Sequence, residues 1–359
     1  MTTADAISLE DLAGARVGVV GAGRTGLAVI EALSDLGARI YLLDTRSDAA
    51  DAVTAPLERV TVGDDAALAD ALAQCRPDLL IVSPGVPATG PVLTGARRDG
   101  TRVWSEIELA WRLQRSTRPE VPWIVVTGTD GKTTTVGMLS AVLTAAGLNA
   151  PAVGNIGAPA ITTVLEGRAD AMAVELSSFQ LHTTRTLSPL AAACLNLAPD
   201  HLDWHGGLAA YGADKARVYA RTRRAAVYNT ADASTRAMVE RADVAEGCLA
   251  VGFTLAVPAL GQVGVVEDLL VDRALHADLW LIQYNADTPM TYASLSAEYT
   301  PYARFDAFAH RRIYGCNTHN SHYYEEVPLH PDRLLAELIA IIHPELLPDH
   351  RFRYFSPLR

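Results

Sequence analysis

The sequence predicts an α/β protein built from two successive parallel-sheet units and a C-terminal segment of different composition. Two observations carry this prediction. Short β-rich runs alternate with alanine- and leucine-rich segments of helical length, and the alternation restarts after a polar, proline-containing stretch at residues 114–122. Such alternation is typical of parallel sheets covered by helices. The chain of 359 residues is long enough for two or three domains, which we expect at residues 1–115, 122–275 and 276–359.

Composition limits the classes of partner. The net charge is −11 and Lys and Arg form no basic run, which argues against a nucleic-acid-binding surface. The N-terminal residues lack a basic segment followed by an apolar one, and no apolar run of about 18 residues follows. We therefore expect a cytoplasmic protein that does not enter the membrane. Four widely spaced cysteines form no CxxC pair, so ordinary thiols are expected rather than disulfides or a zinc site.

The first unit opens with a strand at Arg16–Val20, and further strands are expected at Arg39–Leu43 and Leu79–Val82. The first strand runs into the motif GAGRTG at residues 21–26 and then into a helical run. The glycines allow a tight turn, and the helix N-terminus offers N–H groups to a phosphate. Asp44, 18 residues after the motif, places a carboxylate where a ribose hydroxyl could lie. A Rossmann-like nucleotide-binding unit is predicted, with an unliganded glycine turn as the alternative.

The second unit opens with a strand at Trp123–Thr127, which leads into a short phosphate-binding loop and a helix. Only two residues, not the usual four, separate the two glycines of the loop. Lys132 would neutralise phosphate charge and Thr133 would ligate magnesium. A phosphate-cleaving loop makes the first unit a holder of a nucleotide-linked substrate rather than of NAD. The ATP-binding residues expected are Gly128, Thr129, Asp130, Gly131, Lys132, Thr133 and Thr134.

Acidic and basic side chains follow two further predicted strands, Ala171–Glu175 and Ala191–Leu195. Ligands of open α/β sheets bind at the carboxyl ends of strands, so Glu175 is a candidate metal ligand; a structural carboxylate paired with a lysine is the alternative. His201 is a candidate for a second magnesium or for orienting a phosphate, whereas the sequence leaves the role of His205 open.

These pieces, in this order, resemble the Mur ligases of peptidoglycan synthesis over about residues 10–275. The resemblance is carried by TGTDGKTT, GNIG, ELSSFQL and DHLDWH, and the triplet Asp44-Thr45-Arg46 favours the D-glutamate-adding branch of the family. It implies a ligase that spends ATP to join D-glutamate to UDP-N-acetylmuramoyl-L-alanine through an acyl phosphate, with two Mg²⁺ ions.

The resemblance also assigns roles to residues of this sequence. It implies that Lys215 acts as a carbamate, since an ammonium cannot ligate Mg²⁺ and a carbamate can. Lys132, Asn155, His201 and Lys215 would be catalytic. Thr133, Glu175, His201 and the carbamate of Lys215 would hold metal. The substrate would contact Gly23, Thr25, Asp44, Thr45, Arg46, Ser83, Gly85, Asn155 and Ser177.

Two other hypotheses stay open. A folylpolyglutamate-type ligase would share the short phosphate loop, but such enzymes lack a unit like the one that contains residues 21–26. The second hypothesis is a nucleotide-binding or interaction protein without turnover. It stays open because the third domain that closes over ATP in a complete Mur ligase is not found in the sequence.

The composition changes near residue 275. Of 26 glycines only Gly315 lies beyond it, whereas seven of ten histidines and eight of twelve tyrosines do. Through the runs ADLWLIQYNAD, YARFDAFAHRRIYGCNT and PDRLLAELIAIIHPELLPDHRFRYF, this tail resembles the C-terminal end of a bacterial solute-binding protein for iron complexes. That family works outside the cytoplasm, and we therefore expect a chimera; a natural family variant is the alternative. The tail histidines lack the i, i+4 spacing of a helical metal site. Asp332–Ile342 is an apolar helical run that needs a packing partner.

Overall fold

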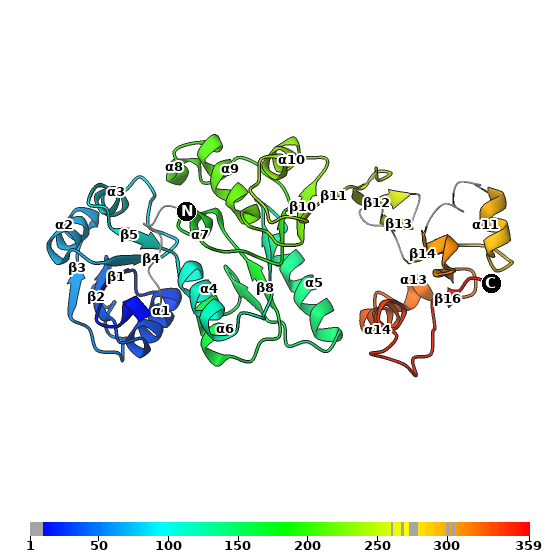
Figure 1. Cartoon of the computed structure of the whole chain (residues 1–359), viewed down its shortest axis with the longest axis horizontal. Helices are drawn as coiled ribbons and strands as arrows, with labels where there is room; N and C mark the ends of the chain where they lie inside the picture. Colours follow the sequence, from blue (N-terminus) through cyan, green and yellow to red (C-terminus); the bar gives the residue numbers. More distant parts are fainter. Residues whose placement is uncertain (1–9, 260, 267–268, 273–278, 299–301, 303–305) are drawn as a thin grey trace.

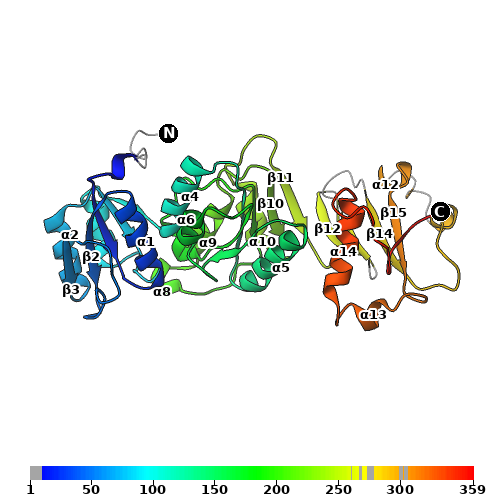
Figure 2. The ribbon, with the colours of Figure 1, turned by 90° about the horizontal axis from the view of Figure 1, so that it is seen from below.

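The computed structural model describes residues 10–259, 261–266, 269–272, 279–298, 302 and 306–359. Three sheet-based units follow one another along its longest axis (Figures 1 and 2). They lie within the three predicted segments, whose exact limits stay a prediction, since the limit near residue 275 falls outside the described residues. No helix of the described residues is long and apolar enough to cross a bilayer.

The first sheet is five-stranded and parallel, in the order β3-β2-β1-β4-β5, which confirms the predicted Rossmann-like arrangement. Because β1 lies between β2 and β4, the strand order reverses at its carboxyl end, where open α/β sheets bind ligands. The strands are β1 (Arg16–Val20), β2 (Arg39–Asp44), β3 (Arg59–Val62), β4 (Leu79–Val82) and β5 (Arg102–Trp104), and the helices are α1 (Arg24–Asp35), α2 (Asp65–Cys75) and α3 (Pro91–Arg98).

The second sheet has eight strands in the order β13-β12-β11-β10-β9-β6-β8-β7, and only β13 is antiparallel to its neighbour. The strands are β6 (Trp123–Thr127), β7 (Ala152–Gly154), β8 (Met172–Glu175), β9 (Ala191–Cys194), β10 (Ala225–Asn229), β11 (Leu249–Phe253), β12 (Gln262–Val266) and β13 (Leu269–Asp272). The helices are α5 (Lys132–Ala145), α6 (Ala160–Glu166), α7 (Ser178–His182), α8 (Leu202–His205), α9 (Leu208–Ala216) and α10 (Ala233–Glu240).

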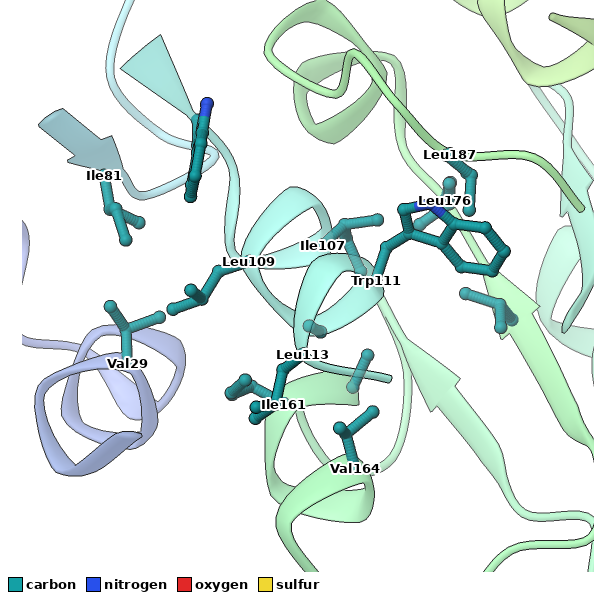
Figure 3. Packing of buried hydrophobic residues seen from close by; sticks show 14 of the residues in the cluster. Val29, Ile81, Ile107, Leu109, Trp111, Leu113, Ile161, Val164, Leu176 and Leu187 are labelled. Atoms are coloured by element: carbon teal, nitrogen blue, oxygen red, sulfur yellow. The ribbon is translucent and has the colours of Figure 1, made fainter. Parts of the chain in front are cut away.

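Helix α4 (Glu106–Thr117) joins the first two units. Ser105 precedes it, and the hydroxyl of Ser105 caps it by accepting from the N–H of Glu108. In Figure 3 its Leu109 points toward Val29 and Ile81 of the first unit, while Trp111 points toward the second. Trp111 packs edge-to-face on Trp123, with ring centroids 5.4 Å apart. The two units therefore share one apolar core.

The polar stretch expected at residues 114–122 is a linker only in its second half. Helix α4 continues to Thr117, and the Gln114 side chain, almost fully buried, donates to the carbonyl of Arg118 at 2.7 Å. The helix persists because packing on both sides of α4 outweighs the low apolar content of its last turn.

The tail forms a three-stranded sheet in the order β14-β15-β16, which confirms an α/β character for this segment. The predicted helix is α14 (Pro331–Ile342); it packs on a cluster that contains Cys316 and Phe355. Glu337 of α14 accepts the backbone N–H groups of Arg353, Tyr354 and Phe355. The other elements are β14 (Trp280–Tyr284), β15 (Ile313–Asn317), β16 (Ser356–Pro357), α11 (Tyr292–Glu298), α12 (Asp306–Ala309) and α13 (Tyr323–Glu326).

Candidate active site

The loop between β6 and α5 has the backbone geometry of a phosphate-binding turn. Gly128 and Gly131 have φ of 153° and 80°, in the region that favours glycine. The N–H groups of Thr129 and Asp130 donate to Oδ1 of Asn196 at 2.9 and 2.8 Å, which holds the loop on the end of β9. Within the described chain no side chain caps α5, so the N-terminal end of this helix faces outward with its N–H groups suited to an anion.

A buried carboxylate lies beside this loop. Glu175 ends β8, with β6 and β7 as its parallel neighbours, and is 1% exposed. Its Oε2 accepts from the Thr133 hydroxyl at 2.9 Å and its Oε1 from the Asn155 amide at 2.8 Å. Three predicted site residues therefore converge, and both donors to the carboxylate are neutral. A hydroxyl and an uncompensated carboxylate are ligands that Mg²⁺ prefers, so these residues fit a magnesium ion next to a bound phosphate.

Both candidate lysines contact the loop. Nζ of Lys132 donates to the carbonyl of Thr129 and Nζ of Lys215 to that of Gly128, each at 2.7 Å. Lys215 is 2% exposed and its Nζ lies 4.7 Å from the ring centroid of Tyr211. Burial lowers the pKa of the Lys215 ammonium to about 8, against the opposing influence of nearby acidic groups. A substantial fraction of this amine is therefore neutral near physiological pH.

Two predicted residues lie apart from the carboxylate cluster. His201 has a left-handed backbone with φ of 49°, and its side chain is 52% exposed, with Nε2 3.3 Å from Oδ2 of Asp200. Its hydrogen bonds and ion pairs, as far as the described residues show them, do not reach Thr133 or Glu175. Ser177 caps α7, and its hydroxyl accepts from the N–H of Gln180 at 3.2 Å. The metal role of His201 and the substrate role of Ser177 stay predictions.

The first unit has a pocket of about 180 Å³ at the carboxyl ends of β1, β2 and β4. Predicted substrate residues that line it are Asp44, Thr45, Ser83 and Gly85. Gly23, by contrast, is the N-cap of α1, and Thr25 lines a narrower gap against the second unit, together with Ser83.

Asp44 is also a structural residue of this pocket. Its Oδ2 accepts from the N–H of Ala22 at 2.6 Å and its Oδ1 from the N–H of Arg46 at 2.8 Å. Burial raises the pKa of this carboxyl, but these hydrogen bonds and the Arg46 guanidinium outweigh it and hold the pKa below its usual range. The ionised side chain thus orders the glycine turn.

Several residues that shape the site had not been singled out from the sequence. Asp214 lies between His182 and His205, with its Oδ2 2.8 Å from Nδ1 of each. His205, whose role the sequence left open, is fully buried, and its Nε2 lies 2.9 Å from the Ser178 hydroxyl, so it is structural. Burial lowers the pKa of His205, which keeps this imidazole neutral. One sequence signal could have strengthened the site: the chain has only two lysines, and both contact the phosphate loop.

Two acidic residues of α4 also form buried hydrogen bonds and had not been singled out from the sequence. Glu108, which is fully buried, accepts from the N–H groups of Arg185 and Thr186 at 2.7 and 2.8 Å. Glu106 accepts from the N–H of Ile161 at 2.6 Å, and its Oε2 is buried without a hydrogen-bond partner within the described structure. Burial raises the pKa of Glu106 to about 7. Both carboxylates fix how the first unit sits on the second.

Among the described residues, the one group of three side chains placed to share a metal ion is His182, His205 and Asp214, and it contains no residue of the tail. The four cysteines are free thiols.

Comparison with known proteins assigns the first two units. Residues 15–105 match the "Mur ligase MurD-like, N-terminal domain" and residues 126–261 the "Mur ligase middle domain". The UDP-N-acetylmuramoylalanine--D-glutamate ligase of Streptomyces coelicolor is 46% identical over 276 residues, which cover 75% of this chain and 58% of that protein. Its namesake in Mycolicibacterium vanbaalenii is 49% identical over 278 residues, covering 77% and 55%. The chain thus spans between about half and three-fifths of the length of these relatives.

Among solved structures, the UDP-N-acetylmuramate:L-alanyl-gamma-D-glutamyl-meso-diaminopimelate ligase of Neisseria meningitides is similar at 18% identity and a TM-score of 0.43, over 73% of this chain and 85% of that chain.

Proposed function

Over residues 15–261 the chain belongs to the Mur ligase family, and we propose that it is the ATP-dependent ligase that adds D-glutamate to UDP-N-acetylmuramoyl-L-alanine. The observation that carries the proposal is the convergence of Thr133, Asn155 and Glu175 beside the loop that precedes α5. A simple nucleotide holder needs phosphate contacts, whereas a buried carboxylate facing the same loop suits phosphoryl transfer. The names of the relatives supply the substrate class.

In the proposed reaction the substrate carboxylate attacks the γ-phosphorus of ATP, so that an acyl phosphate forms and ADP leaves. The amine of D-glutamate then attacks the acyl carbon, an amide bond forms, the bond from that carbon to the bridging oxygen breaks so that phosphate leaves with this oxygen, and the nitrogen releases one proton. Lys132 and the N–H groups at the start of α5 hold the transferred phosphate and neutralise its charge. Bound Mg²⁺, held by Thr133 and Glu175, would add charge neutralisation, and His201 would serve a second ion.

Lys215 would act as a carbamate. Its neutral amine attacks CO₂, so that a C–N bond forms while one C=O π pair moves to oxygen, and the nitrogen then loses one proton to solvent. The lowered pKa and the contact with Gly128 support this assignment, because only the unprotonated amine is a nucleophile and the product lies at the phosphate loop.

The pocket of the first unit would hold the uridine nucleotide. Thr45, Ser83 and Gly85 line it, and the turn that Asp44 orders offers backbone N–H groups to a diphosphate. Gly23, Thr25 and Arg46 would complete the contacts, and Asn155 and Ser177 would meet the far end of the substrate. Since ATP and such precursors are cytoplasmic, we place the reaction in the cytoplasm.

A nucleotide-binding protein without turnover is the second candidate. The matched family domains stop at residue 261, and a different three-stranded sheet follows.

Phosphate release from ATP by the whole purified chain tests the proposal, with UDP-N-acetylmuramoyl-L-alanine and D-glutamate supplied together and each omitted in turn. Release that requires both, and that is lost in Lys132→Ala, supports the ligase. Nucleotide binding without release supports the second candidate, and release that needs neither substrate contradicts both. Arg236→Ala, which removes an exposed arginine of α10, is a control for the loss of a cation.

A further inference from the structure

A buried polar network beside the candidate active site is centred on Asp214. This residue is 4% exposed and directly precedes Lys215 on α9. Its Oδ2 lies 2.8 Å from Nδ1 of both His182 and His205, and its Oδ1 lies 3.3 Å from Nε of Arg217. One carboxylate thus joins the ends of α7 and α8 to α9.

The hydrogen-bond partners of the two rings determine where the protons lie. Nη2 of Arg97 is 2.6 Å from Nε2 of His182, and a guanidinium only donates, so this Nε2 accepts and the proton of His182 is on Nδ1. The Ser178 hydroxyl can donate to Nε2 of His205 in the same way. Both imidazoles are then neutral donors to Asp214. The position that a metal ion would need between Asp214 and the two rings is then occupied by two N–H groups.

The face of α9 next to the one that carries Asp214 contacts the phosphate loop. Tyr211 and Lys215 are four residues apart and so share one face of the helix. The Tyr211 hydroxyl lies 3.1 Å from Oγ1 of Thr129, and Nζ of Lys215 donates to the carbonyl of Gly128. Asp214 holds one side of α9 while the neighbouring side presents Lys215 to the loop.

The network also crosses between the two units. Arg97 belongs to α3 of the first unit, where its Nη1 donates to the carbonyl of Ala88 at 2.9 Å. Nη2 of Arg97 contacts Nε2 of His182 in the second unit. A continuous line of hydrogen bonds therefore runs from the first unit through His182 and Asp214 to the helix that carries Lys215.

We propose that Asp214 is a positioning residue: held by His182 and His205, it fixes α9 so that Lys215 stays at the phosphate loop, and through His182 and Arg97 it ties this placement to the first unit. This inference rests on the proposed ligase function for its effect on turnover. The placement of Lys215 at the phosphate loop, which this inference predicts, can be measured whether or not the protein turns over ATP.

The kinetic test compares Asp214→Asn and Arg97→Gln with wild type. The amide keeps the size of the carboxylate but turns an NH₂ toward His182 and His205 or toward Arg217. We expect kcat for phosphate release to fall about 10- to 100-fold, as for other residues that orient a ligand, while KM for the uridine substrate changes less than about threefold. Glu240→Gln, exposed at the end of α10, is the matched control and should retain wild-type kcat. The double variant should lose less than the product of the two single losses, because both interrupt one line.

The second test does not depend on activity. Because the chain has only two lysines, a protein labelled with ¹³Cε-lysine gives two side-chain signals, assigned with Lys132→Arg. Asp214→Asn should move the Lys215 signal toward that of an exposed lysine, and Arg97→Gln should move it in the same direction by less. Glu240→Gln should leave it in place. Unchanged Lys215 signals in both variants overturn the proposal, even if turnover falls with loss of folded protein. If wild type releases no phosphate, the ligase function fails and the lysine signals still decide the positioning role.

Discussion

Nζ of Lys215 lies 2.7 Å from the carbonyl oxygen of Gly128, although the two residues are 87 positions apart in the chain. The contact places a buried amine on the loop that would hold the ATP phosphates. Lys132 contacts the next carbonyl of the same loop, so both lysines of the protein are committed to this site.

The first prediction concerns the pH dependence of Lys215 carbamylation. The pKa of about 8 lies below the usual value for lysine, so the neutral amine increases as pH rises through 8. After CO₂ is removed, phosphate release should recover on its return about eightfold faster at pH 8.5 than at pH 7.0, at fixed dissolved CO₂. Recovery rates are measured in a coupled phosphate assay. Equal rates at both pH values would contradict the assignment.

The second prediction concerns Glu175→Gln. The amide can keep both hydrogen bonds, because its oxygen accepts from Asn155 and its NH₂ can donate to the Thr133 hydroxyl. The free energy of unfolding should change by less than about 1 kcal/mol. Phosphate release should fall at least about 100-fold, since the metal loses an anionic ligand. Chemical denaturation and a magnesium titration of activity check the two parts, and a variant with near wild-type turnover would remove Glu175 from the metal site.

The third prediction separates two glycines of the first turn. A Cβ on Gly26 would lie 1.9 Å from the carbonyl oxygen of Gly21, whereas a Cβ on Gly23 meets nothing within 4 Å. Gly26→Ala should destabilise the protein by about 2 kcal/mol or more and abolish binding of a uridine nucleotide. Gly23→Ala should change stability by less than about 1 kcal/mol. Calorimetric titration with the nucleotide would also show whether Gly23 contacts it, because the added methyl group then weakens binding.

The fourth prediction concerns the junction at α4. Glu108→Ala removes the buried carboxylate that accepts from Nε of Arg112, from the N–H of Arg185 and from the N–H and hydroxyl of Thr186. The free energy of unfolding should fall by about 3–5 kcal/mol. Glu120→Ala, which removes an exposed partner of Arg118, should change it by less than about 1 kcal/mol. Denaturant unfolding followed by tryptophan fluorescence reports on both, because Trp111 lies on the same helix. Equal losses in the two variants would contradict the anchoring role of Glu108.

The fifth prediction concerns Glu106→Gln. The folded-state pKa of about 7 lies above the ordinary 4.5, so the folded protein binds a proton more tightly than the unfolded chain between these values. Wild-type stability should therefore fall as pH rises from 4.5 to 7, and the glutamine variant should lack this loss. The stability of the variant relative to wild type should rise over that window by an amount on the order of 3 kcal/mol. Unfolding is measured at pH 5 and pH 8, and a difference that does not depend on pH would show that Glu106 is ionised at both.

The sequence by itself determined the features that depend on local order along the chain. The strands at Arg16–Val20 and Trp123–Thr127 were predicted at their observed limits, because an apolar run followed by glycines marks both a buried strand and its turn. The parallel sheets followed from the alternation of strands and helices. The motifs around Lys132 and Glu175 indicated the site, because each is a run of consecutive residues after a predicted strand.

Only the tertiary structure decided which side chains meet. Thr133, Asn155 and Glu175 converge because β6, β8 and β7 lie side by side, an order that their sequence does not specify. Helix α4 runs past the predicted boundary because apolar surfaces of two units close on it. Asp214 is a buried partner of His182 and His205 because helix packing brings those rings together. Pairings between distant residues depend on how whole elements pack, and the spacing of residues along the chain carries little of that information.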